Sequence, residues 1–303
     1  YETNYVYYPN EQTSWEGVMD RFDTNNSQNS YVFSIDYTPD TTWTVNAGLN
    51  GYYGPKTYGI YEVPTIIYDK NHVQESSYFT SNDHQRSTKT NNLYLQVTKK
   101  LNSRWSINWS SYFTDNHSTN DQDVLTALRF KGEEPTDTRF ISNNGNKNRL
   151  FSSQIDFTGK IKKLGMEFGG KFSDVKTTST LAFFDDESGE LEQRPDKSSV
   201  FDYKERNVAL YGSLDYAWKK WSWKAGLRGE YTDLEGIVSE PADINKRDYF
   251  VLFPTFYMQY ALADDQQFGF SYGKRISRPA YSWLNPAKSY YNRFSYFQGD
   301  PRL

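Results

Sequence analysis

Residue types that carry acid–base or metal chemistry are scarce in this sequence. The chain has three histidines and no cysteine, which excludes disulfides, thiolate metal sites and cysteine nucleophiles. His72, His84 and His117 fall in polar stretches that we expect to be long loops, and no two have the spacing of metal ligands on one element. The sequence contains neither a G-x-S-x-G elbow nor a P-loop. We therefore expect no metal site, no cofactor and no enzymatic activity.

An acidic run could supply oxygen ligands to a hard cation. Asp185, Asp186, Glu187 and Glu190 lie close together in the sequence. Their spacing is not that of an EF-hand loop, which presents its ligands at fixed positions. A solvated acidic loop is the simpler interpretation, and a Ca²⁺ site stays open as the alternative.

Charged residues recur on one side of the clearest β pattern. Apolar and polar residues alternate over residues 221–232, and side chains alternate across a strand, so every second residue shares a face. The charges of interest on this face, and after the last alternating run, are Lys224, Arg228, Glu230, Arg275 and Arg278. If the apolar face meets lipid, these charges line an interior. There they either form a paired network that stiffens the wall and contacts an inner domain, or contact a ligand directly.

Aromatic side chains also occur in otherwise polar segments. Flat rings bind sugars, aryl chelators or peptides by stacking. The candidates for ligand contact are Tyr78, Phe79, Phe183, Phe184, Tyr290, Tyr291, Tyr296 and Phe297. Packing of these rings against neighbouring loops explains their presence equally well.

Period-2 alternation predicts the elements that position these residues, and helical periodicity is nearly absent. The pattern predicts ten strands, around residues 31–37, 43–53, 93–97, 105–113, 151–157, 166–172, 208–216, 221–232, 252–260 and 268–272. None of the residues that form their apolar faces is charged. Charged residues on a lipid-facing surface would be costly, so this pattern suits a membrane-embedded wall.

The predicted connections alternate between short and long. Short ones lie near residues 38–42, 99–104, 160–164, 217–220 and 261–266, and long polar segments cover residues 54–90, 114–149, 173–206 and 233–248. This asymmetry is typical of outer-membrane barrels, which have short periplasmic turns and long extracellular loops. Tyrosine and tryptophan crowd the short turns, as they do at membrane interfaces. A soluble sandwich is the alternative, because it also has one apolar face per strand.

Composition narrows the functional classes. The chain has 303 residues, 18% aromatic residues and a formal net charge of −4, with a mean hydropathy of −0.85. A nucleic-acid binder needs a clustered basic excess, so that class is excluded. No apolar stretch approaches the roughly 18 residues of a transmembrane helix. The sequence shows no initiator Met and no signal peptide, and it begins at Tyr1 within a regular pattern, so we interpret the chain as an internal piece of a larger protein.

The last third of the chain resembles the barrel of TonB-dependent outer-membrane receptors, in the form common in Bacteroidota. The matching pieces, in order and spacing, are Gly226-Leu227-Arg228, Glu230-Tyr231-Thr232, Leu252-Phe253-Pro254, Ser271-Tyr272, Arg275-Ile276-Ser277-Arg278-Pro279, Leu284-Asn285-Pro286, Gly299-Asp300-Pro301 and Leu303. The resemblance implies an all-β, antiparallel, up-and-down transmembrane barrel of about 22 strands. Residues 1–303 would then be part of one barrel domain, without the plug domain and the remaining strands.

The same resemblance implies the function and the partners. Such a receptor binds a scarce nutrient outside the cell and opens its plug when the TonB complex pulls on it. The nutrient would be an iron chelate, cobalamin, an oligosaccharide or a peptide. The implied partners are outer-membrane lipid, the TonB complex and the nutrient, with a surface lipoprotein as a further candidate and no nucleic acid. A passive porin, or a plugless structural barrel in a surface complex, is the alternative.

Overall fold

Antiparallel strands account for most of the chain in the computed structural model. It describes residues 2–8, 13–24, 27–186, 189–239, 242–290, 292, 294–300 and 302. The strands are β1 (Glu2–Tyr8), β2 (Thr13–Thr24), β3 (Asn29–Tyr37), β4 (Trp43–Tyr68), β5 (Gln74–Lys100), β6 (Trp105–Arg129), β7 (Thr136–Ile161), β8 (Leu164–Asp185), β9 (Glu192–Gln193), β10 (Ser199–Trp218), β11 (Trp221–Val238), β12 (Asp243–Ala263), β13 (Gln266–Gly273), β14 (Ser289–Tyr290) and β15 (Tyr296–Phe297). A short 3₁₀ helix, η1 (Pro195–Lys197), and a short α-helix, α1 (Tyr281–Leu284), complete the described elements.

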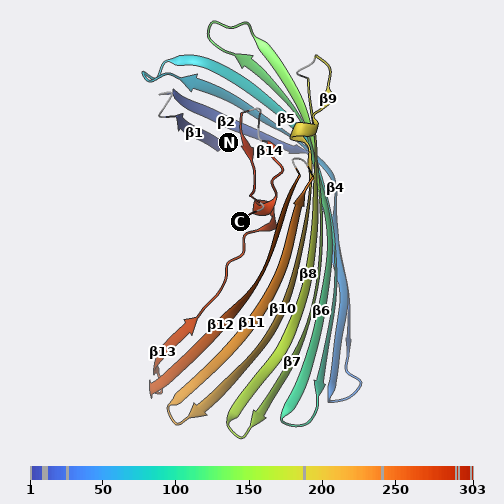
Figure 1. Cartoon of the computed structure of the whole chain (residues 1–303), viewed down its shortest axis with the longest axis vertical. Coiled ribbons are helices and arrows are strands. Elements are labelled where there is room, and N and C mark those ends of the chain that lie inside the picture. Colours follow the sequence, from blue (N-terminus) through green and yellow to red (C-terminus); the bar gives the residue numbers. More distant parts are fainter. Residues whose placement is uncertain are drawn as a thin grey trace.

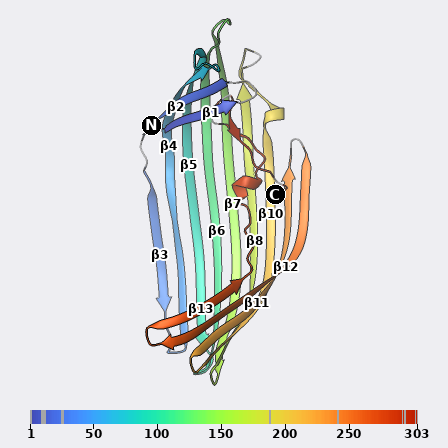
Figure 2. The ribbon, with the colours of Figure 1, turned by 90° about the vertical axis from the view of Figure 1, so that its left-hand side faces the viewer.

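One curved sheet of 13 strands forms the body of the molecule (Figures 1 and 2). Its order is β1-β2-β4-β5-β6-β7-β8-β10-β11-β12-β13, with β3 paired to β4 and β9 paired to β8. Each long strand is antiparallel to the next, so the chain runs up and down along a section of barrel wall. The ten predicted strands are all present, as β3 to β8 and β10 to β13. In the described part of the chain, β3 pairs only with β4 and β13 only with β12, so the wall is open.

The lower half of the wall carries an apolar band on its outer, convex face. On β10 the outward positions from Val208 to Trp218 hold no charge, whereas Arg206 precedes the band and Lys219 follows it. The stretch from Val208 to Trp218 is eleven residues long, which suits a tilted strand crossing a bilayer. Leu210 is 70% exposed in the isolated chain, so lipid is the medium that buries this face.

The four long polar segments are strands for most of their length, and the prediction of long loops is therefore wrong. β4 and β5, for example, run up to a tight turn over residues 69–73, where the Asp69 carboxylate accepts the backbone N–H groups of Asn71 and Val73. Above the membrane the outward face meets water, so it carries polar residues while the backbone ladder continues. Threonine-rich stretches such as residues 177–180 keep a high β propensity without an apolar face.

The buried core lies on the inner, concave face of the upper half. Its most buried large side chains include Phe201 and Val124, which are 1% and 0% exposed. After Gly273 the chain leaves the sheet, and residues 274–300 run along this concave face through α1 and the β14–β15 hairpin (Figures 1 and 2). Among the residues that the structure describes, no helix is long and apolar enough to cross a bilayer. Tyr1 and Leu303 lie outside the described residues.

Candidate functional site

A carboxylate on the inner face of β11 joins the C-terminal segment to the wall. Glu230 is 9% exposed, and its two oxygens accept hydrogen bonds from Arg228 Nε at 2.6 Å and Arg278 Nη2 at 2.8 Å. Arg278 also bonds Thr232 Oγ1 at 3.3 Å and lies 3.9 Å from a carboxylate oxygen of Glu205. Because charge-assisted hydrogen bonds are stronger than neutral ones, this cluster fixes the start of the segment against the sheet.

The five charged residues that the sequence pattern singles out lie together beside this cluster. Lys224, Arg228, Glu230, Arg275 and Arg278 all line one open cavity of about 530 Å³. Lys224 Nζ pairs with Glu167 Oε2 at 3.3 Å. The cavity lining holds five basic residues, Lys224, Arg228, Lys274, Arg275 and Arg278, against the two acids Glu167 and Glu230. The wall therefore presents a net positive surface to the interior of the barrel.

Two of the quoted sequence motifs pair with each other inside the C-terminal segment. The N–H groups of Gly299 and Asp300 donate to the carbonyls of Asn285 and Trp283 at 2.9 and 2.8 Å, and Gln298 Nε2 donates to the Pro286 carbonyl. A Cβ on Gly299 would lie 2.4 Å from the Trp283 carbonyl oxygen. Only glycine fits this close approach of two backbones, so the Leu-Asn-Pro and Gly-Asp motifs together close a loop.

Three side chains of the segment contact separate parts of the wall, and two of them, Leu284 and Tyr290, are buried. Leu284 is 5% exposed and packs with Phe201, Tyr203 and Val238 of β10 and β11. Tyr290 packs with Val124, Phe140 and Phe183 of β6, β7 and β8. Burial raises the pKa of Tyr290 to about 12, so its phenol stays neutral at physiological pH. The centre of the Phe294 ring lies 5.8 Å from that of Trp15 on β2 and 4.9 Å from that of Tyr78 on β5.

The candidate ligand aromatics do not form one surface. Tyr78 and Phe183 point inward and are 5% and 4% exposed, whereas their neighbours Phe79 and Phe184 point to the outer face by strand alternation. None of these four lies in an irregular loop, because all are on β5 or β8. Tyr291 lies outside the described residues. Tyr296 and Phe297, on β15, are 46% and 40% exposed.

Some of these rings line a second cavity, which lies higher on the inner face. It measures about 250 Å³, and its lining includes Phe183, Tyr290, Tyr296, Asp185, Lys197 and Lys288. Lys288 Nζ lies 4.4 Å from the centre of the Tyr296 ring, and Lys197 Nζ lies 5.2 Å from that of Phe183. The cavity therefore combines aromatic faces with two ammonium groups, which suits a flat or negatively charged group.

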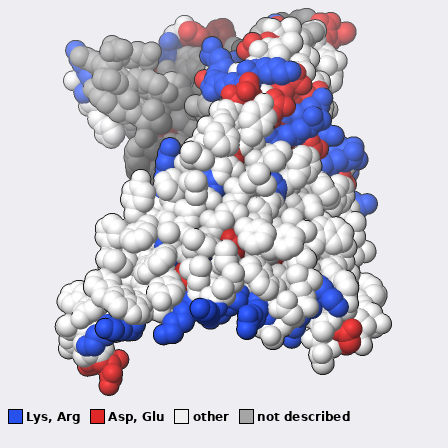
Figure 3. All heavy atoms as spheres, turned by 60° about the horizontal axis from the view of Figure 1, so that its bottom comes forward, with Lys and Arg blue, Asp and Glu red and all other residues white. Residues whose placement is uncertain are grey.

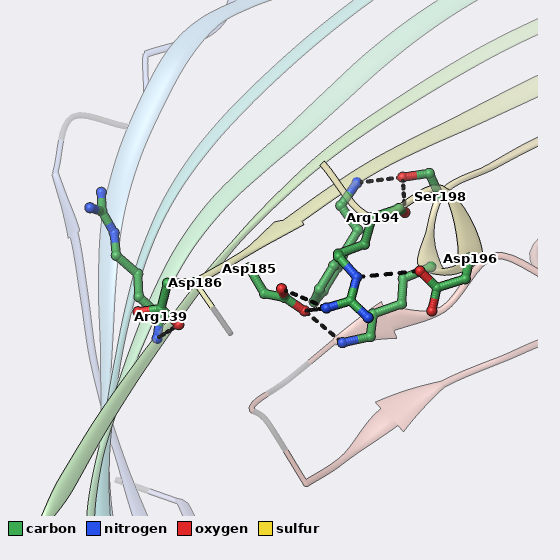
Figure 4. Close-up of polar contacts among 8 residues, drawn as sticks. Arg139, Asp185, Asp186, Arg194, Asp196 and Ser198 are labelled. Carbon is green, nitrogen blue, oxygen red and sulfur yellow. Dashed lines mark hydrogen bonds and ion pairs between the residues drawn. The ribbon is translucent and has the colours of Figure 1, made fainter. Parts of the chain in front are cut away.

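The acidic run next to this cavity is already paired (Figure 4). Asp185 accepts hydrogen bonds from Lys197 Nζ at 2.6 Å and from Arg194 Nη1 at 3.1 Å, and Asp186 accepts the backbone N–H of Arg139. Burial alone would raise the pKa of Asp185, but the Lys197 hydrogen bond and the two positive charges outweigh it and lower that pKa. Glu187 lies outside the described residues, which contain no group of carboxylates and histidines arranged for a metal.

The histidines are placed differently from the sequence-based expectation. His84 and His117 lie on β5 and β6, so the prediction that both are in loops is wrong. His84 is 3% exposed and stacks on Tyr61, with ring centres 4.4 Å apart. His117 Nε2 lies 3.2 Å from an oxygen of Asp115. Only His72 is in a turn, where it stacks on Tyr68. Their strands look polar because the upper half of the wall stands outside lipid.

Comparisons with known proteins place the chain in a family. The model of a family described as "Outer membrane protein beta-barrel family" matches residues 106–303. No curated protein matches the chain. The closed form of the ferric-catecholate import receptor Fiu from Escherichia coli K12 is 9% identical, with a TM-score of 0.48 over 85% of this chain and 49% of that chain. The ferric yersiniabactin uptake receptor FyuA from Yersinia pestis is 12% identical, with a TM-score of 0.48 over 83% of this chain and 45% of that chain.

The chain spans about half the length of these solved receptors. The family match covers well over half of the chain, and the antiparallel wall with its apolar outer band agrees with it. The chain therefore belongs to the outer membrane protein β-barrel family and forms part of the wall of a barrel in the bacterial outer membrane.

Proposed function

We propose that this chain is part of a TonB-dependent receptor that takes up a scarce nutrient across the outer membrane. The observation that carries the proposal is the C-terminal segment on the inner face of the wall. A passive porin needs a water-filled lumen. Here the C-terminal segment lies along that face and is held by the buried side chains of Leu284 and Tyr290 and by the ion pair of Arg278 with Glu230. Such an interior suits a barrel filled with protein, which must be opened by an input of energy.

The positive cavity is proposed to contact a plug domain that lies outside this chain. The cavity lining has five positive charges and two negative ones, from Glu167 and Glu230, which leaves an excess of three positive charges. Lys274 and Arg275 are exposed in this chain and have no ion pair among the described residues, so a domain that covers them must bring charges of opposite sign. Acidic side chains of a plug would supply them. On this proposal further strands complete a barrel of about 22 strands around that plug.

The nutrient is proposed to bind near the upper cavity. Tyr296 is the exposed ring there, and Lys288 lies against it. Phe183 and Tyr290 line the same cavity but are packed against each other, with ring centres 4.8 Å apart, so their main role is to shape it. An iron chelate, cobalamin, an oligosaccharide or a peptide could each offer a flat or charged group to this site. Delivery by a surface lipoprotein would fit the last two.

Uptake by living cells tests the proposed class of function. Cells that carry the complete protein should accumulate the nutrient only when TonB and the inner-membrane proton gradient are intact. Deletion of tonB or a protonophore should reduce uptake to the background of cells that lack the protein. The complete protein in liposomes should not increase their swelling rate in small sugars. Uptake that persists without TonB, together with rapid swelling, would instead identify a passive porin.

Substitution of the exposed ring tests the proposed ligand site. Tyr296→Ala should weaken nutrient binding to whole cells by roughly tenfold, because one stacking ring contributes about 1–1.5 kcal/mol. Phe79→Ala is the matched control, since Phe79 is similarly exposed but points to the outer face. Equal binding by the two variants would remove Tyr296 from the site without affecting the proposal of energy-coupled uptake.

A further inference from the structure

Three of the short turns at the lower end of the wall carry a continuous run of positive charge. They connect β5 to β6, β7 to β8 and β10 to β11. Their basic residues are Lys99, Lys100, Arg104, Lys160, Lys162, Lys163, Lys219 and Lys220. We call this set the basic rim. No acidic residue occurs in these three turns, whereas the flanking turns hold Asp40, Asp264 and Asp265. Figure 3 shows the basic side chains gathered along this edge of the molecule.

The charges at the other border of the apolar band are arranged differently. There, on the outer face, Arg206 and Lys176 pair with Asp174 at 3.3 and 3.5 Å, and Arg149 pairs with Asp115 at 2.8 Å. No residue of the basic rim forms an ion pair within the part of the chain that the structure describes. These basic residues of the upper border therefore have acidic partners within the wall, whereas the rim must obtain its counter-charges from its surroundings.

Two rim lysines show which surroundings these are. Lys99 Nζ lies 4.4 Å from the centre of the Trp43 ring, and Lys219 Nζ lies 4.9 Å from that of Trp218. Both tryptophans are on the outer face of the wall, at the lower end of the apolar band. Tryptophan at such a position lies at the level of lipid headgroups. The two ammonium groups are therefore held on the lipid side of the wall and not over the lumen.

We propose that the basic rim binds the phosphate groups of anionic phospholipids in the periplasmic leaflet of the outer membrane. Clusters of four to eight basic residues beside a membrane attract anionic headgroups, and the attraction falls as salt rises. A lysine presents three donors to a phosphate while its methylene stem lies along the apolar surface. Seven of the eight rim residues are exposed, and the eighth, Lys99, is half-buried against Trp43.

Lipid retention by the complete receptor tests this proposal. The receptor is purified in detergent, mixed with equal amounts of phosphatidylglycerol and phosphatidylcholine, and analysed by native mass spectrometry. We expect preferential retention of phosphatidylglycerol, which decreases in higher salt. In the variant K162Q/K163Q/K219Q, the preference for phosphatidylglycerol over phosphatidylcholine should fall by at least about tenfold. Each basic residue near the membrane surface raises the affinity for anionic lipid by roughly fivefold. Heat-modifiable migration on a gel verifies that the variant is folded.

The opposite end of the wall provides a matched control. K70Q/K131Q/K204Q removes the same number of exposed lysines from the upper half and should retain phosphatidylglycerol as the unmodified receptor does. Equal retention of the two lipids by the unmodified receptor, or equal losses in both variants, would overturn the proposal. Displacement of the lipid by sn-glycerol-1-phosphate at the same concentration would also overturn it, because the rim would then be a site for soluble anions.

Discussion

The lower and upper halves of the same strands place their apolar residues on opposite faces. On β10, Leu210 and Leu214 point outward in the lower half, whereas Phe201 and Tyr203 point inward in the upper half. β8 shows the same change, because Phe168 and Phe172 point outward in its lower half and Val175 and Phe183 point inward in its upper half. The pairing of β8, β10 and β11 has no register shift along its length. The strands continue unchanged while the hydropathy pattern changes phase.

The change of phase shows that the surroundings decide which face is apolar. In the lower half lipid covers the outer face, and the inner face meets a polar interior. In the upper half water covers the outer face, and residues 281–300 cover the inner one. The level at which the phase changes, near Val208 on β10, therefore marks the upper border of the membrane.

The largest expected effect is on the docking of the C-terminal segment against the buried core, on the inner face of the upper half. Leu284→Ala should weaken docking of the C-terminal segment by about 2–5 kcal/mol, because it leaves a cavity against Phe201 and Tyr203. Hydrogen exchange of the complete protein should then show faster exchange over residues 281–300 and unchanged protection in the lower halves of β10 and β11. Unchanged protection of the segment would mean that its apolar contacts do not hold it.

A charge on the outer face should distinguish the two halves directly. Leu214→Arg places a cation within the apolar band and should cost about 2–4 kcal/mol of unfolding free energy in lipid vesicles. Val200→Arg is the control, because Val200 also points outward but lies on the upper half of β10. It should change the free energy by less than about 0.5 kcal/mol. Similar costs at the two positions would show that the membrane border is misplaced.

The ionic anchor should contribute less than the apolar ones. Arg278→Met removes the hydrogen bonds to Glu230 and Thr232 and should cost about 1.5–3 kcal/mol of segment docking, the range for charged hydrogen bonds. Glu230 keeps Arg228 as a partner, which limits the loss. A double-mutant cycle with Glu230→Gln, read as protease protection of residues 281–300, should give a coupling energy well above zero. Additive losses would contradict a direct bond.

The smallest effect is expected for the paired carboxylate beside the upper cavity. The lowered pKa of Asp185 means that its contribution is complete above the ordinary carboxyl pKa and is lost as pH falls through the lowered one. Exchange over residues 189–198 should therefore become faster only below about pH 4. Asp185→Asn should show fast exchange already at pH 7 and no further acid transition. An acid transition that persists in this variant would assign it to another group.

The sequence predicted the lower half of the molecule much better than the upper half. Alternation such as that of residues 221–232 located the ten strands of the lower half, because lipid requires an uninterrupted apolar face. In the upper half, Phe183 and Tyr203 were separated from that pattern by the change of phase, so their strands looked like polar loops. A search for alternation whose phase shifts by one residue within a strand would have found them.

The candidate site was predicted in part for the same reason. Lys224, Arg228 and Glu230 share a face by simple alternation, and the structure brings Arg275 and Arg278 to the same cavity. The segment that carries Arg278 leaves the sheet after Gly273, five residues before Arg278. No local pattern encodes its path, which depends on contacts with β2, β5 and β8 that are distant in the sequence. The position of Tyr290 and Phe294 was therefore out of reach of sequence reasoning.

These distant contacts have a consequence for the order in which the protein assembles. Phe294 meets Trp15 near the other end of the chain, and Tyr290 meets Phe140. Neighbouring strands can pair as local hairpins, whereas the C-terminal segment finds its three partners only after β2 to β11 stand side by side. Contacts that close long loops form late because their entropy cost comes first. Docking of Tyr290 and Phe294 is thus a late event, and protease resistance of residues 281–300 would report the moment at which β2 to β11 have assembled.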